Sequence, residues 1–256
     1  MGATDDLRHL PKGWAWTKPA ELVAAWLGDP FLANPDDSLL PPGCSDSTWI
    51  LHNQYICPEG VEVPAYWNDE EDPGQGFGIG SHPPSGWQRL TWHELAAYKG
   101  VPLNGPSFHG HEVPPCFRWE ASLGRVEVIN GNRVAASAPT EGSLGKGDLE
   151  NLIPVLAAHT SSTRADGAFS ECDLGARLRD GTQLAVTFDL TTMLPAMLGE
   201  TETQFTPEYW WPEDRSWVVW TDWDLEGTKV FGSHDLVQSL RNHPNIETLN
   251  WSSPRS

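Results

Sequence analysis

The strongest structural signal lies in Trp210-Trp-Pro-Glu-Asp-Arg-Ser-Trp-Val-Val-Trp-Thr-Asp-Trp-Asp-Leu-Glu-Gly-Thr-Lys-Val-Phe-Gly-Ser233. Aromatic and β-branched residues, which favour strands, are concentrated in residues 216–223 and again in residues 228–231. The segment Leu225-Glu-Gly227 connects the two runs over a distance suited to a turn. The sequence therefore predicts a long strand over 216–223 that pairs with a shorter one over 228–231.

Side chains of a strand alternate between its two faces, so every second residue of this stretch is expected on the same side. One face is expected to carry Trp220, Asp222 and Asp224. The other is expected to carry Trp217, Val219, Thr221 and Trp223. The stretch thus places two carboxylates beside a tryptophan on one face of a strand.

Helices are predicted where a capping residue precedes apolar residues at helical spacing. The clearest case is the T-x-x-E capping box of Thr91 and Glu94, after which Leu95 and Tyr98 are expected to face inward until Gly100. The other predicted helices run from Thr17 to Leu27, from about Asp148 to His159 with a kink at Pro154, and from Ser233 to Leu240.

Further strands are predicted from short β-branched and aromatic runs. They cover residues 48–57, a hairpin over 126–134 that turns at Asn130-Gly131, residues 184–190 and residues 246–251. His52 falls inside the first of these and is interpreted as a hydrogen-bonded sheet residue. Strands and helices alternate too irregularly for a doubly wound parallel sheet.

The expected fold is therefore α+β, with mixed, mainly antiparallel sheets, a few short helices and two subdomains. Residues 1–138 form the first subdomain, which includes a flexible loop rich in acidic residues and glycine over 67–86. Residues 139–256 form the second, and the boundary falls near residues 135–142, where alanines are followed by Pro139.

The charge balance excludes several classes of function. The chain has 35 acidic against 16 basic residues, a formal net charge of −19. Nucleic-acid binding and binding to anionic lipid both require a basic surface, so neither is expected. No stretch is long and apolar enough to span a membrane, and the first 30 residues do not resemble a targeting segment. We expect a soluble cytoplasmic protein.

Composition favours binding of a basic protein. The chain has 14 tryptophans, and indole rings beside carboxylates can anchor a cationic partner, as in immunity-type inhibitors of basic toxins. The preferred interpretation of Arg215 is a structural one, in which its guanidinium pairs with Asp214 or Asp222 and stacks on a tryptophan. The candidate binding residues are Trp210, Trp211, Glu213, Asp214, Arg215, Trp220, Asp222 and Asp224.

Two alternatives stay open beside binding, which ranks first. Paired carboxylates can hold a hard cation or act as general acid and base, so Asp222, Asp224 and Glu226 could serve a metal-assisted hydrolase or transferase. Exposed tryptophans could instead bind carbohydrate by stacking. No cofactor is predicted.

A second group of metal-ligand types occurs in the segment His109-Gly-His-Glu-Val-Pro-Pro-Cys116. Its spacing is not the H-E-x-x-H pattern that places two histidines on one helix face, and no C-x-x-C pair is present. Ordinary loop residues are the preferred interpretation. The weak metal candidates are His109, His111, Glu112 and Cys116.

The segments 211–217, 221–225 and 227–230, with the closing Pro-x-Ile-Glu247, resemble a C-terminal module of uncharacterised actinobacterial proteins. Upstream, Glu141-Gly-Ser-Leu144 and the following helix are similar to the same module, so the resemblance covers about residues 139–251. Pro154 departs from the family's pattern. The resemblance implies no activity and no catalytic residues.

Overall fold

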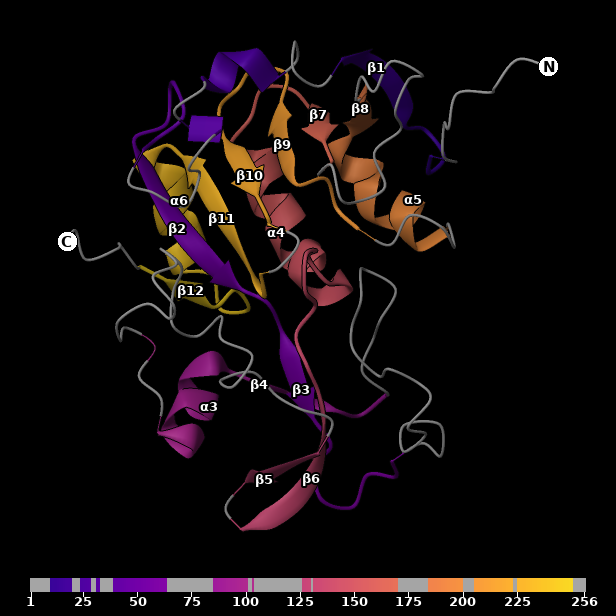
Figure 1. The fold of residues 1–256 in the computed structure, drawn as a ribbon, viewed down its shortest axis with the longest axis vertical. Coiled ribbons are helices and arrows are strands. Elements are labelled where there is room, and N and C mark those ends of the chain that lie inside the picture. Colours follow the sequence, from indigo (N-terminus) through magenta and orange to yellow (C-terminus); the bar gives the residue numbers. More distant parts are fainter. Residues whose placement is uncertain are drawn as a thin grey trace.

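The computed structural model describes residues 10–19, 24–28, 31–32, 39–63, 85–100, 103, 126–129, 131–169, 184–199, 205–222 and 225–250. Their strands form an eight-stranded sheet in the order β1-β8-β7-β9-β10-β11-β2-β12 and a four-stranded sheet in the order β4-β3-β6-β5. Every pair of neighbouring strands is antiparallel. Figure 1 shows the smaller sheet and α3 below the larger sheet. The predicted α+β class is confirmed.

The larger sheet contains β1 (Ala15–Pro19), β2 (Asp46–Leu51), β7 (Arg164–Ala168), β8 (Leu184–Asp189), β9 (Tyr209–Pro212), β10 (Val218–Trp220), β11 (Gly227–Gly232) and β12 (Thr248–Leu249). The smaller sheet contains β3 (Gln54–Ile56), β4 (Gln88–Leu90), β5 (Val126–Ile129) and β6 (Asn132–Ser137). The helices are α3 (Trp92–Lys99), α4 (Lys146–Ala158), α5 (Met193–Gly199) and α6 (His234–Arg241), with short 3-10 turns η1 (Ala25–Leu27) and η4 (Leu190–Thr192).

Apolar side chains cover both faces of the larger sheet. One face packs against α4, α5 and α6, with Trp217 and Val219 among its buried residues. The opposite face packs against the η1 segment, and Val218 and Trp220 lie there. These residues alternate along the chain as the period of a strand requires. The predicted division of Trp217 and Val219 from Trp220 is therefore confirmed.

The predicted pairing of residues 216–223 with 228–231 is confirmed, but the first strand is shorter than expected. Regular pairing covers only β10, whose Trp220 lies opposite Lys229 of β11. The strand ends at Trp220, and beyond it the Leu225 N–H donates to the Asp222 carbonyl over 3.1 Å. The last predicted strand is also shorter and reduces to β12.

The predicted start of the first helix at Thr17 is wrong, because β1 occupies residues 15–19, but its predicted end is helical, since Ala24 is in a helix and η1 follows it. Trp16 lies opposite Val186 of β8, and the Thr17 hydroxyl donates to the Ala185 carbonyl over 3.2 Å rather than capping a helix. Pairing with a distant strand thus overrides the local helical pattern. Leu22 and Val23, which supported the helix, lie outside the described residues.

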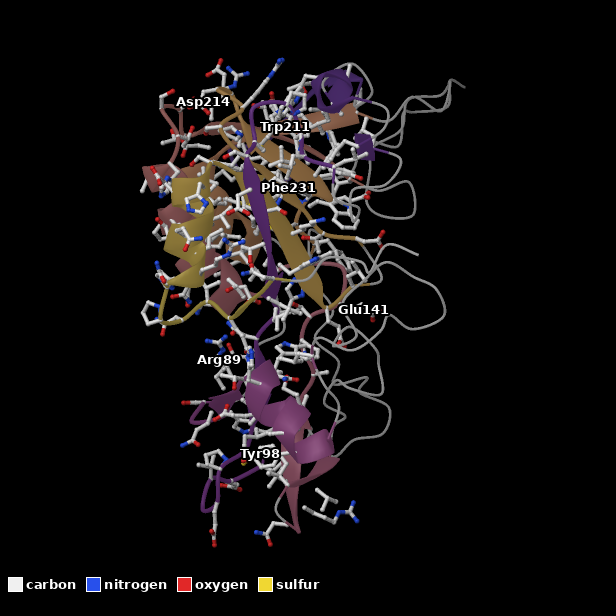
Figure 2. The ribbon with its side chains drawn as sticks, turned by 90° about the vertical axis from the view of Figure 1, so that its left-hand side faces the viewer. Arg89, Tyr98, Glu141, Trp211, Asp214 and Phe231 are labelled. Carbon is white, nitrogen blue, oxygen red and sulfur yellow. The ribbon has the colours of Figure 1, made fainter. Side chains whose placement is uncertain are left out.

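The other predicted helices are confirmed. In α3 the Thr91 hydroxyl accepts from the Glu94 N–H, the Glu94 carboxylate accepts from the Thr91 N–H, and Gly100 ends the helix at φ 66°. Leu95 is buried as expected, but Tyr98 is 44% exposed, so its predicted inward direction is wrong. Figure 2 shows Tyr98 at the end of the molecule opposite Asp214. Pro154 lies inside α4, as the sequence indicates.

The strand predicted over 48–57 is interrupted at His52 and Asn53, so that β2 belongs to the larger sheet and β3 to the smaller one. The hairpin of β5 and β6 is confirmed, with Gly131 at φ 81° in its turn.

The larger sheet takes strands from both sides of residue 138. Its strands β1 and β2 precede that residue, and its other strands follow it. Most of the predicted loop 67–86 lies outside the described residues.

Gly167, in the middle of β7, supplies a test of this packing. A Cβ at this position would lie 2.8 Å from Cβ and Cγ of Pro207 and 3.3 Å from the Tyr209 carbonyl oxygen. The proline ring and the backbone cannot move aside easily, so Gly167→Ala should lower the free energy of unfolding by about 2 kcal/mol. Urea unfolding measures the change. Gly199→Ala is the control, since among the described residues no atom outside its own helix lies within 4 Å of the added Cβ, and equal losses would contradict the expectation.

Candidate functional site

Three exposed carboxylates lie at one end of the larger sheet, and we call Asp189, Glu213 and Asp214 the acidic rim. Asp189 ends β8 opposite Arg164, the first residue of β7. Glu213 and Asp214 follow β9, whose Pro212 pairs with the next residue of β7. Antiparallel pairing therefore brings the ends of three strands, far apart in sequence, to one edge. Figure 2 shows Asp214 at this end of the molecule.

Three consecutive hydroxyl residues hold the rim. Ser161 donates to Asp214 Oδ2 from its backbone N–H over 2.6 Å and from its hydroxyl over 2.7 Å. The Ser162 hydroxyl donates to Glu213 Oε2 over 3.2 Å, and the Thr163 hydroxyl donates to Asp189 Oδ2 over 3.1 Å. Each carboxylate is thus oriented by a different residue of one segment.

Hydrogen bonds stabilise the ionised form of two rim carboxylates. Partial burial would raise the pKa of Asp214, but the N–H and hydroxyl of Ser161, with donors at Ser216 and Thr160, hold that pKa well below its ordinary value. The Thr191 hydroxyl lowers the pKa of Asp189 in the same way. Both groups therefore remain negatively charged in mildly acidic solution.

No rim carboxylate forms an ion pair with another residue of the described part of the chain. The two nearby arginines are directed elsewhere. Arg164 donates from Nε to the Thr187 hydroxyl over 3.1 Å, and the Arg215 guanidinium lies 5.0 Å from the centre of the Trp26 ring. The predicted stacking of Arg215 on a tryptophan is thereby confirmed. The rim carries negative charge that is oriented but not neutralised.

The tryptophans among the candidate binding residues lie in the core. Trp210 has no exposed area, while Trp211 and Trp220 are 2% and 3% exposed. Their neighbours on the turn after β9 behave differently, because Glu213, Asp214 and Arg215 are all exposed. A partner at this end of the sheet therefore meets charged side chains, whereas the indoles pack between the layers.

Two of the three candidates for metal-assisted chemistry lie within the described residues. Asp222 and Glu226 are half-buried and each has an interaction partner, while Asp224 lies outside the described residues. Among the residues that the structure describes, no group of three or more His, Cys, Asp or Glu could hold a metal ion. The weak metal candidates His109, His111, Glu112 and Cys116 also lie outside these residues.

Sequence reasoning missed Asp189 and the hydroxyl residues that hold the rim. The available signal was the run Thr160-Ser-Ser-Thr163 directly after a helix, since such residues often hydrogen-bond to nearby carboxylates and backbone. Nothing local links this run to Asp189, which is 26 residues from Thr163.

A second polar cluster, buried between the sheets, surrounds His52. Its Nδ1–H donates to the Thr140 carbonyl over 2.6 Å, because a carbonyl can only accept, and its Nε2 therefore accepts from the Thr228 hydroxyl over 2.8 Å. Thr221 and Thr228 share a further bond of 2.7 Å. Burial lowers the pKa of His52 to about 4, against the opposing Thr140 bond, so the ring is neutral. His52 is hydrogen-bonded as predicted, but it lies between β2 and β3 rather than within a strand.

Comparison of the chain with protein-family models, with curated proteins and with solved structures gives no match. The resemblance to uncharacterised actinobacterial proteins therefore stays a prediction. None of the helices within the described residues has the length and apolar character needed to cross a membrane.

Proposed function

We propose that the protein binds a basic partner protein in the cytoplasm and that the acidic rim is its contact surface. The observation that carries the proposal is the set of three exposed carboxylates, each oriented by hydroxyl or backbone donors and none neutralised by an ion pair within the described residues. Carboxylates held in place lose little conformational freedom when a lysine or arginine approaches.

The overall charge supports the same conclusion. A net charge of −19 produces a field that accelerates encounter with a positively charged protein. The low pKa values of Asp189 and Asp214 keep that attraction in mildly acidic solution. An immunity-type inhibitor of a basic toxin is the specific form of this function that we favour. The metal-assisted and carbohydrate-binding alternatives stay predictions.

The test is capture of partners from a lysate of the source cells, using the tagged full chain at about 0.05 M and 0.5 M salt. We expect one stoichiometric basic protein, identified by mass spectrometry, to be retained at low salt and depleted at high salt. The rim variant Asp189→Asn, Glu213→Gln, Asp214→Asn should bind it roughly tenfold more weakly, because exposed charge pairs contribute up to about 1 kcal/mol each.

A matched control separates the rim from total charge. The variant Glu59→Gln, Glu62→Gln, Asp235→Asn removes the same three charges from exposed positions outside the rim. It should retain nearly full binding, and circular dichroism should show both variants folded. Equal weakening of binding by the two variants would show that net charge acts without a defined surface. Undiminished binding by the rim variant would exclude the rim.

A further inference from the structure

Two chain segments connect the sheets, and both run beside the start of α4. The first is His52-Asn53, between β2 of the larger sheet and β3 of the smaller one. The second is residues 138–145, between β6 and α4. The bond from His52 Nδ1 to the Thr140 carbonyl joins one connection to the other. Figure 1 shows β3 and the chain entering α4 side by side at this level.

Asp148 forms a second link at the same place. It lies in the first turn of α4 and is 6% exposed. Its Oδ1 accepts the backbone N–H of Asn53 over 3.2 Å, and its Oδ2 accepts the N–H of Gly145 over 3.1 Å. Because α4 packs on the larger sheet and Asn53 leads directly into β3, this one carboxyl group spans the junction between the sheets.

Polar side chains converge on the start of α4. A Cβ on Gly147 would lie 2.8 Å from the Tyr55 hydroxyl and 3.2 Å from Asn53 Nδ2. A Cβ on Gly145 would lie 3.2 Å from Asp148 Oδ2 and 3.5 Å from the Thr140 hydroxyl oxygen. Asn53 Oδ1 and the Thr140 hydroxyl oxygen are buried and have no hydrogen-bond partner within the described part of the chain. The amide oxygen can accept and the hydroxyl can accept or donate, so either atom is able to take the O–H of a protonated carboxyl group.

The charged groups around Asp148 do not neutralise it. From β4, Arg89 acts only through its field, because its guanidinium donates to the Asn245 carbonyl and pairs with Glu247 at 3.7 Å. On α4 itself, Lys146 and Glu150 pair with each other at 3.6 Å. The other titratable side chains on the two connections and β3 are Tyr55, the neutral His52 and Glu141.

We propose that the Asp148 carboxyl group is a protonation-dependent contact that holds the smaller sheet on the larger one, and that its ionisation promotes opening of the junction. The physical reason is desolvation. An ionised carboxylate without a paired cation is unfavourable in a buried position, whereas opening exposes it to water.

The direction of the effect follows from linkage. Burial raises the pKa of Asp148 to about 7, against the opposing N–H donors of Asn53 and Gly145 and the charge of Arg89. In the open state the carboxyl regains its ordinary, lower pKa, while His52 keeps its bonds to Thr228 and to the Glu226 carbonyl on the larger sheet and stays neutral. At pH values between the open-state and closed-state pKa, the closed state therefore keeps a proton that the open state has lost. The equilibrium constant for opening then increases as pH rises toward 7, by up to about tenfold per pH unit.

Native-state hydrogen exchange of the full chain between pH 5 and 7 tests the proposal. The amides of Asn53 and Gly145 report directly, because both donate to Asp148. After correction for the intrinsic exchange rate, their protection should fall at least tenfold over this range in the wild type. It should stay constant in Asp148→Asn, which keeps a carbonyl acceptor but cannot ionise.

Controls keep the outcome decisive. Glu150→Gln removes an exposed carboxylate from the same helix and should keep the wild-type pH dependence. The amide of Val230, in the middle of the larger sheet, should keep its protection while the junction amides lose theirs, and this comparison needs no variant. Constant junction protection in the wild type would overturn the proposal. So would a parallel loss at Val230, or an unchanged slope in Asp148→Asn.

Discussion

Trp217→Ala is expected to lower the free energy of unfolding by about 4 kcal/mol, because the truncation leaves a large cavity in a closely packed core. The Trp217 side chain has no exposed area and lies where β10 meets α4. Its ring centre is 5.4 Å from that of Trp210, and its indole N–H donates to the Leu156 carbonyl of α4 over 3.1 Å. Urea unfolding at neutral pH measures the loss.

Two further variants divide this loss between packing and hydrogen bonding. Trp217→Phe keeps an aromatic ring but removes the indole donor and part of the buried volume, while the Leu156 carbonyl still accepts the His159 N–H over 3.0 Å, so about half of the loss should remain. Trp16→Ala removes a half-buried tryptophan from β1, at the edge of the same sheet, and should cost well under half as much. Equal losses for Trp217→Ala and Trp16→Ala would show that burial at α4 does not determine stability.

The second large effect is a pair of opposed pH dependences in global unfolding, which exposes both His52 and Asp148. The pKa of His52 falls from 6.5 to about 4 on folding, so the unfolded chain binds the extra proton and stability decreases as pH falls through this range. The pKa of Asp148 rises from 3.8 to about 7, so the folded chain binds the extra proton and stability decreases as pH rises. Between about pH 4 and 6.5, where the pH ranges of the two groups overlap, their contributions to the free energy of unfolding cancel in the wild type.

Single substitutions should reveal each contribution. Asp148→Asn leaves only the His52 contribution, so relative to the wild type its unfolding free energy should rise with pH by up to about 1.4 kcal/mol per unit. His52→Gln leaves only the Asp148 contribution and should show the opposite slope. The double variant should again parallel the wild type. Urea unfolding at half-unit steps from pH 4.5 to 6.5 measures all four proteins, and four parallel profiles would contradict the assignment.

Local patterns predicted the elements whose causes are local. The capping box of Thr91 and Glu94, the Ser233 cap and the turn at Gly131 depend on residues a few positions apart, and all three occur as expected. The alternation around Val219 also follows from strand geometry alone. The prediction failed at Thr17, where hydrogen bonding to β8, 168 residues away, replaces the cap.

The candidate site was predictable only in part. Glu213 and Asp214, named as candidates from the sequence, are exposed, but β9 before them was not predicted. The tryptophans beside them are buried because both faces of the sheet are covered. A sequence pattern shows which residues share a face, whereas the exposure of that face depends on what packs against it. Asp189 joins the rim through strand pairing, which no local pattern contains.

By itself the sequence determined the α+β class, the pairing of β10 with β11, the caps of α3 and α6 and the strong negative charge, since these depend on composition and on neighbouring residues. Only the tertiary structure determined the break at His52, the burial of Asp148 and the assembly of the acidic rim. Each of those depends on strands and helices distant in sequence that exclude water or supply hydrogen-bond donors, and such contacts exist only once the sheets have formed.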